Sequence, residues 1–122
     1  MKNDFMIIIS VKDLDASVDF YKNIIGFDLA KKIKPGPGIN IAFMLFNNAI
    51  EIELLKRKDL PDVTNENSGI TLSFKSNDVD AAYEMLLANN VKCEGKPFAL
   101  PTGIKVVRFF DPNGVCISFM EE

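Results

Sequence analysis

The chain has 122 residues, a length that suits one domain with a buried core, and nearly half of them are apolar. Its formal charge is −3 and its basic residues form no stripe, so we do not expect nucleic-acid binding. The longest early apolar run, residues 5–9, is too short to span a membrane, and no small-residue cleavage site follows it. These features predict a cytoplasmic protein without a membrane partner.

The absence of histidine excludes several kinds of active site. Two-histidine iron sites and histidine-activated nucleophiles cannot form, and a second copy of the chain would not supply the missing residue. The two cysteines, Cys93 and Cys116, do not suggest a disulfide framework. Without histidine to activate it, Cys116 is better interpreted as a small core residue than as a reactive thiol.

The first half of the sequence predicts a strand, a helix and three further strands. Residues 6–11 form a short apolar, β-branched run typical of a strand, and Asp13 follows as a helix N-cap. Apolar residues at helical spacing lead to Gly26, a residue type common just past a helix end. Three more strands are expected at residues 28–33, 39–46 and 49–55. The Pro- and Gly-rich segment 34–38 predicts a loop, and Asn47-Asn48 predicts a tight turn.

The second half repeats this order after a polar and charged linker at about 57–68. Asp78 is expected to cap a helix that ends at Asn89-Asn90. Asp111-Pro112-Asn113-Gly114 is a strong turn signal between the last two strands. The strands of this half are expected at residues 70–75, 91–94, 105–110 and 115–120.

One offset of 65 residues relates the two halves. It places Asp13-Leu14-Asp15-Ala16-Ser17 on Asp78-Val79-Asp80-Ala81-Ala82, and it places Ile52-Glu53-Leu54-Leu55 on Ile117-Ser118-Phe119-Met120. A common register at two distant places is better evidence for a repeat than either match alone. We therefore expect a single domain, residues 1–122, with repeat one at about 5–56 and repeat two at about 69–122.

The order and spacing of several short patterns resemble those of the vicinal-oxygen-chelate superfamily, which includes glyoxalases, bleomycin-resistance proteins and dioxygenases. The patterns are Val11 to Ser17, Phe20-Tyr21, Ile25-Gly26-Phe27, Asn77 to Tyr83 and Asp111 to Gly114. The resemblance implies an α+β fold of two βαβββ repeats, with curled mixed sheets and helices on their outer face. It does not imply one activity, because members catalyse isomerisations, oxygenations or thiol transfers, or simply sequester drugs.

In metal-dependent members of this superfamily, the ligands project from the first and last strands of each half. The matching positions here are Met6, Glu53, Thr71 and Ser118. Only Glu53 is a good ligand, because a thioether is soft and neutral and hydroxyls bind divalent ions weakly. The resemblance therefore implies a degenerate metal site, and we expect no cofactor. A weaker magnesium or calcium site at Glu51 and Glu53 stays open, although Glu51 is better interpreted as a solvated charge.

Alternation along the strands predicts which side chains line the concave face. If Glu53 points into the cup, residues two positions away share its face. The predicted ligand-binding residues are Met6, Ile8, Glu51, Glu53, Thr71, Ser73, Cys116 and Ser118. The opposite set is expected to form the core: Ile7, Ile9, Ile52, Leu54, Leu72, Phe74, Ile117 and Phe119. A concave lining of acids, hydroxyls and apolar side chains suits a small amphipathic ligand.

Two interpretations of Glu53 remain open at this point. The carboxylate either contacts a ligand or pairs with Lys75 or Lys105 as an ordinary surface ion pair. Most phenylalanines are expected in the core, although Phe43 or Phe109 could stack on a flat ligand.

The leading functional hypothesis is a metal-free small-molecule binding protein of the bleomycin-resistance type. It would sequester a drug or an amphipathic metabolite and act as a homodimer, since members of the superfamily commonly pair two chains. The alternative is a lyase or isomerase of the glyoxalase type, with Glu53 as the general base or as a weak metal ligand. Such an enzyme would have only Lys75 or backbone amides to stabilise an enolate. A third hypothesis is an interaction module without a small-molecule ligand.

Overall fold

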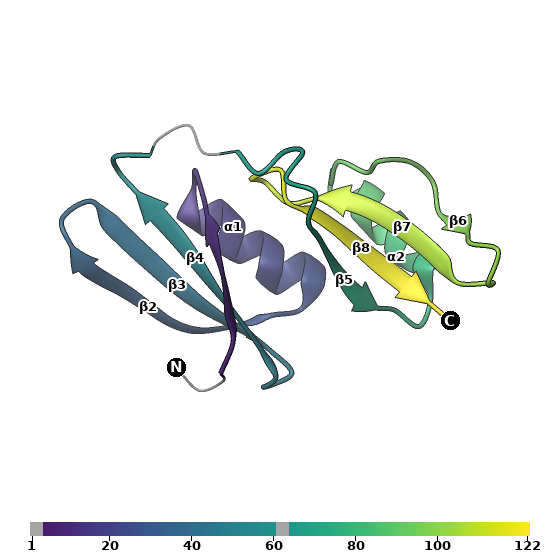
Figure 1. Cartoon of the computed structure of the whole chain (residues 1–122), viewed down its shortest axis with the longest axis horizontal. Coiled ribbons are helices and arrows are strands. Elements are labelled where there is room, and N and C mark those ends of the chain that lie inside the picture. The colour runs from purple at the N-terminus through teal and green to yellow at the C-terminus, as the bar shows by residue number, and fades with distance from the viewer. Residues whose placement is uncertain (1–3, 61–63) are drawn as a thin grey trace. The chain divides into compact units, whose positions relative to one another are not determined.

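The computed structural model describes residues 4–60 and 64–122. Contacts divide the chain into two compact units, Met1–Thr64 and Asn65–Glu122, and each is described by itself. Each unit holds one four-stranded mixed sheet and one α-helix (Figure 1). No helix in the described part of the chain is long and apolar enough to cross a membrane.

In the first unit, the helix covers one face of the sheet. The strands lie in the order β1-β4-β3-β2; β1 and β4 run parallel, and the other neighbours run antiparallel. The helix α1 packs over β3 and β4 (Figure 1). The bounds of the elements are β1 Met6–Ser10, α1 Leu14–Phe20, a π-helical turn η1 Tyr21–Ile25, β2 Asp28–Gly36, β3 Ile39–Phe46 and β4 Ile50–Arg57.

The second unit has the same topology. Its strands lie in the order β5-β8-β7-β6, with β5 and β8 parallel, and α2 packs over β7 and β8. The bounds are β5 Thr71–Lys75, α2 Val79–Ala88, β6 Phe98–Ala99, β7 Lys105–Phe110 and β8 Cys116–Glu121. The predicted α+β fold with two βαβββ repeats is confirmed.

The parallel strand pair has the same register in both units. Met6 lies opposite Glu51 in the first unit, and Thr71 lies opposite Cys116 in the second. The 65-residue offset carries the first pair of residues onto the second pair. The repeat seen in the sequence is therefore a repeat of strand pairing as well as of element order.

The predicted helix caps are present in both units. The Asp13 carboxylate accepts a hydrogen bond from the Ala16 amide at 3.0 Å, and Asp78 does the same for Ala81. Such caps satisfy amides that have no partner within the helix. The first helix differs from the expected regular helix because its last turn is π-helical, and it ends at Gly26 with a φ of 105°. A π-helical turn inserts one extra residue into the helix.

Two predicted segments of the edge strands differ from the structure. The loop expected at 34–38 is shorter, because β2 continues through Gly36; an edge strand tolerates Pro35 beside its register shift. The strand expected at 91–94 is reduced to one bridge, between Cys93 and Phe109. Gly and Pro follow that bridge closely, and regular pairing resumes only at β6.

The predicted core is largely buried between each sheet and its helix. Six of its eight members are at most 8 % exposed, namely Ile9, Ile52, Leu54, Phe74, Ile117 and Phe119. The other two, Ile7 and Leu72, are half-buried. Both lie on edge strands, which have a neighbouring strand on one side only. The alternation that predicts the core residues therefore also predicts which residues lie on the opposite face of each sheet.

Candidate functional site

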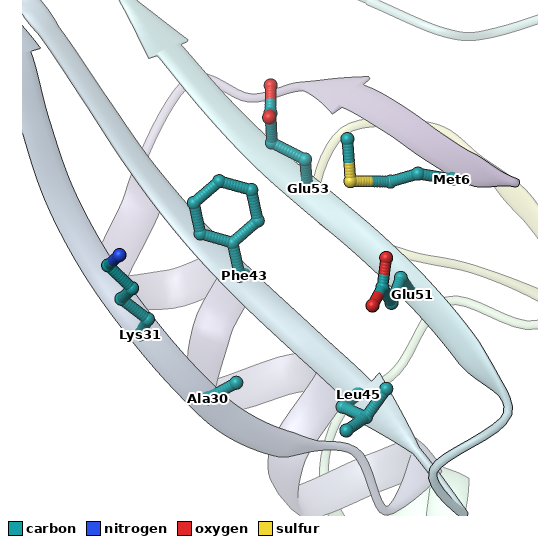
Figure 2. A pocket seen from close by; sticks show the side chains of 7 residues that line it. All are labelled: Met6, Ala30, Lys31, Phe43, Leu45, Glu51 and Glu53. Atoms are coloured by element: carbon teal, nitrogen blue, oxygen red, sulfur yellow. The ribbon is translucent and has the colours of Figure 1, made fainter. Parts of the chain in front are cut away.

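The sheet of the first unit has a hollow of about 500 Å³ on the face opposite α1 (Figure 2). Its lining combines apolar side chains with three charged groups: Met6, Ala30, Lys31, Phe43, Leu45, Glu51 and Glu53. Ile52 and Leu54, which alternate with the two acids on β4, are buried on the other face. A strand with acids on one face and buried apolar residues on the other positions both acids in the hollow.

Two adjacent rows of residues cross the sheet and build this lining. In one row Glu53 lies opposite Ile8 on β1 and opposite Phe43 on β3, and Phe43 lies opposite Lys31 on β2. The second row, one pleat further along, runs from Met6 through Glu51 and Leu45 to Asp28. Residues in such rows are direct neighbours on a sheet face, about 5 Å apart at the backbone.

A β-bulge on the edge strand brings two consecutive residues to the hollow. Leu29 pairs with Met44 and Lys31 pairs with Phe43, so Ala30 is the extra residue between them. In regular pairing only every second residue would reach this face, and a bulge suspends that rule locally. Both Ala30 and Lys31 therefore line the hollow.

Glu53 is the most deeply placed charged group of the hollow. Its exposed fraction is 9 %, and its side chain forms no hydrogen bond or ion pair with any residue that the structure describes. Figure 2 shows its carboxylate standing between the ring of Phe43 and the thioether of Met6. A carboxylate withdrawn from water without a partner is costly, so a group that donates hydrogen bonds would be favoured beside it.

The other two charged groups are more accessible. Glu51 is half-buried and interacts with another residue. Lys31 is exposed, and its ammonium forms no ion pair within residues 4–60 and 64–122, whereas the adjacent Lys32 pairs with Asp15 at 3.0 Å. The hollow thus has a buried negative group and, across Phe43, an accessible positive one.

The structure brings three of the predicted site residues together in this hollow: Met6, Glu51 and Glu53. Ile8 shares their face but is 55 % exposed and lies outside the lining. Three further residues of the lining were not predicted from the sequence: Ala30, Lys31 and Leu45. Alternation from Phe43 along β3 would have indicated Leu45. The bulge that places the other two has no clear sequence signal.

In the second unit, two of the corresponding side chains bond to each other and a third interacts with neighbouring residues. Ser118 is buried, and its hydroxyl donates a hydrogen bond to the Ser73 hydroxyl at 2.8 Å. Arg108 stands where the first unit has Phe43; it lies 4.0 Å from the Glu94 carboxylate and stacks over the Phe98 ring at 5.3 Å. Of the other predicted residues, Thr71 is exposed and Cys116 is half-buried.

The structure also bears on the predicted ion-pair partner of Glu53, on the two phenylalanines suggested to stack on a ligand, and on a metal site. Lys105, one suggested partner of Glu53, pairs with Asp80 at 2.5 Å, and this hydrogen bond raises the pKa of Lys105. Phe109 is fully buried and packs against Phe119 with ring centroids 4.9 Å apart, so it cannot stack on a ligand. Phe43 does line the hollow. Among the described residues, no three Cys, Asp or Glu side chains gather closely enough to hold a metal ion.

Comparison with known proteins identifies the family of the chain. A sequence model of the Glyoxalase/Bleomycin resistance protein/Dioxygenase superfamily matches residues 5–119. The chain belongs to this superfamily. The uncharacterized protein YraH of Bacillus subtilis (strain 168) is 32% identical over 84% of the chain and 85% of its own length. A lactoylglutathione lyase of Arabidopsis thaliana is 29% identical, over 88% of this chain but only 41% of the plant protein.

Solved structures of superfamily members share the fold. Glyoxalase I from Zea mays has a TM-score of 0.83 at 19% identity, over 96% of this chain and 43% of the maize chain. The fosfomycin resistance protein FosX from Listeria monocytogenes has a TM-score of 0.80 at 18% identity, over 100% of this chain and 94% of its own. The superfamily relatives thus range from a glyoxalase to an antibiotic-resistance protein, and the fold alone does not choose between them.

Proposed function

We propose that this protein is a metal-free small-molecule binding protein of the glyoxalase/bleomycin-resistance type, which sequesters a drug or an amphipathic metabolite. The observation that carries the proposal is Glu53, a nine-tenths buried residue in the wall of a hollow of about 500 Å³, whose carboxylate has no partner among the described residues. Ligand sites are typically hollows of this size with an apolar lining and a few polar groups that orient the ligand.

The donor set of this chain does not fit a catalytic divalent ion. Such an ion usually has three protein ligands and one open position. Of the four positions implied by the superfamily resemblance, only Glu53 offers a hard, charged donor, and the Ser118 hydroxyl is already bonded to Ser73. Among the described residues that line the hollow, Glu51 is the single further carboxylate. These residues favour direct recognition of an organic ligand by the protein.

A thermal-shift screen of cationic and amphipathic compounds tests the proposal. A true ligand stabilises the native state by RT ln(1 + [L]/Kd), about 2.7 kcal/mol at a hundredfold excess over Kd. Glu53→Gln should remove this stabilisation, whereas Glu66→Gln, a charge change in the other unit, should keep it. The proposal fails if hits stabilise wild type and Glu53→Gln equally. Stoichiometric zinc, nickel or iron in protein purified without chelators would also contradict it.

A second candidate function is a lyase or isomerase of the glyoxalase type. The match to the plant lactoylglutathione lyase favours it, together with the buried position of Glu53 beside an open hollow. In this function Glu53 would accept a proton from the carbon next to a substrate carbonyl. Turnover of a hemithioacetal by the wild type and its loss in Glu53→Gln would support an enzyme. Equal turnover in both proteins would exclude Glu53 as the base.

We further propose that the protein acts in the cytoplasm as a homodimer. The first unit exposes Phe5 and Ile8 at 74 % and 55 %, and Ile8 lies on β1, an edge strand of its sheet. Exposed apolar side chains beside an open strand edge favour association with another chain. Size-exclusion chromatography with light scattering measures the mass directly. A monomer at micromolar concentration would contradict the dimer.

A further inference from the structure

We infer that the hollow selects a flat ligand that carries a positive group at one end and a negative group at the other. The inference rests on the proposed binding function and adds the chemical class of the ligand. One row of the lining carries it, because Glu53, Phe43 and Lys31 lie side by side on β4, β3 and β2. The order of the row is acid, aromatic ring, base.

The spacing of the row fits a ligand with one aromatic or conjugated body. Neighbouring strands lie about 5 Å apart, so the backbone positions of Glu53 and Lys31 are separated by roughly 10 Å. Figure 2 shows the Phe43 ring between the two charged side chains, on the same side of the sheet. A flat group stacked in an offset manner on this ring would have the acid beyond one edge and the ammonium beyond the other.

Both charges of the row are available to a ligand. Neither Glu53 nor Lys31 forms an ion pair with any residue in the described parts of the chain, and they do not pair with each other. The bulge at Ala30 directs Lys31 to the hollow, while the next residue, Lys32, is held by Asp15. Charge complementarity therefore favours an ammonium or a related cation at Glu53 and a carboxylate or phosphate at Lys31.

Three matched probes test this order of charges on the full chain. 4-(Aminomethyl)benzoate carries both charges at opposite ends of a ring, benzylamine carries only the cation, and 4-methylbenzoate carries only the anion. Their affinities are measured by titration, following the amide NMR signals of β2, β3 and β4. We expect the zwitterion to bind about two- to fivefold more tightly than benzylamine, the gain that a partly exposed ion pair provides. 4-Methylbenzoate should bind most weakly.

Variants assign each charge to its residue. Lys31→Gln should lower the affinity for the zwitterion to that of benzylamine and leave benzylamine unchanged. Glu53→Gln should weaken the binding of both the zwitterion and benzylamine at least tenfold, because it removes the buried charge that pairs with their ammonium group. Lys34→Gln is the matched control: it removes the same charge from the same strand, outside the lining, and should change nothing.

The outcomes separate this inference from the proposed function. If benzylamine binds as tightly as the zwitterion and Lys31→Gln has no effect, the inference is wrong while binding at Glu53 stands. If none of the three probes shifts the amides around the hollow at millimolar concentration, the inference is contradicted, and the thermal-shift screen alone decides whether the binding function stands.

Discussion

Replacing Glu53 with glutamine should stabilise the ligand-free protein. The residue is 9 % exposed and its carboxylate has no partner among the described residues, so folding withdraws part of its hydration without supplying a hydrogen bond in return. Glutamine keeps the size and loses the charge, and it can donate as well as accept hydrogen bonds. The expected gain in the free energy of unfolding is about 1 kcal/mol, because a neutral amide without a partner costs less to bury than a charged carboxylate. For a chain of this size that corresponds to a rise in Tm of about 3–5 °C.

Urea unfolding at neutral pH measures this gain, with protein concentration held constant across variants. Glu51→Gln is the matched control, because it makes the same change two residues away on the same strand. Glu51 is half-buried and interacts with another residue, so its replacement should not stabilise. A loss of 1 kcal/mol or more in Glu53→Gln would refute the reasoning, since it would mean that the carboxylate supports the fold. A stabilising variant that no longer binds ligand would be the expected signature of a binding residue.

Three further predictions concern other contacts. Ser73→Ala should cost about 1 kcal/mol because it leaves the buried hydroxyl of Ser118 without its partner, and the double variant with Ser118→Ala should recover part of that loss in urea unfolding. Asp78→Ala should cost about 1 kcal/mol through loss of the helix cap, measured in the same way. The hydrogen bond to Asp80 raises the pKa of Lys105. The stabilisation that this bond gives is therefore present below the unfolded pKa of 10.5 and is lost as pH rises through the folded pKa. In an NMR titration, Asp80→Asn should lower the pKa of Lys105.

The fold follows from local signals that the sequence shows directly. Asp13 and Asp78 mark helix starts because an aspartate side chain can accept a hydrogen bond from an amide of the first turn. Asn47 and Asn48 both adopt positive φ in the hairpin, a conformation that asparagine tolerates. Alternation then divides each strand between core and concave face. Of the edge strands, β2 and β6 were predicted less well than β1 and β5: β2 contains two register shifts, and β6 is only two residues long.

The site could be predicted only in part. Alternation identified Met6, Glu51 and Glu53, which the structure brings together. It could not identify Lys31, because its place in the hollow depends on the unpaired Ala30 and so on the register between β2 and β3. Nor could it show that Glu53 has no partner among the described residues, because that depends on which cations reach it in three dimensions. A sequence pattern shows on which face of a sheet a side chain lies, whereas the interaction partners of that side chain depend on how the elements pack.

The two repeats share one topology, but they differ in whether the polar side chains in equivalent rows across the two sheets have interaction partners. The offset carries Ile8, Glu53 and Phe43 onto Ser73, Ser118 and Arg108. In the second unit the two hydroxyls bond to each other, and the guanidinium lies near Glu94 and over Phe98. In the first unit the same row leaves a buried carboxylate and an accessible ammonium without partners among the described residues. A buried charge without a partner is destabilising, and the presence of one in only one of the two equivalent rows favours a ligand there over a purely structural role.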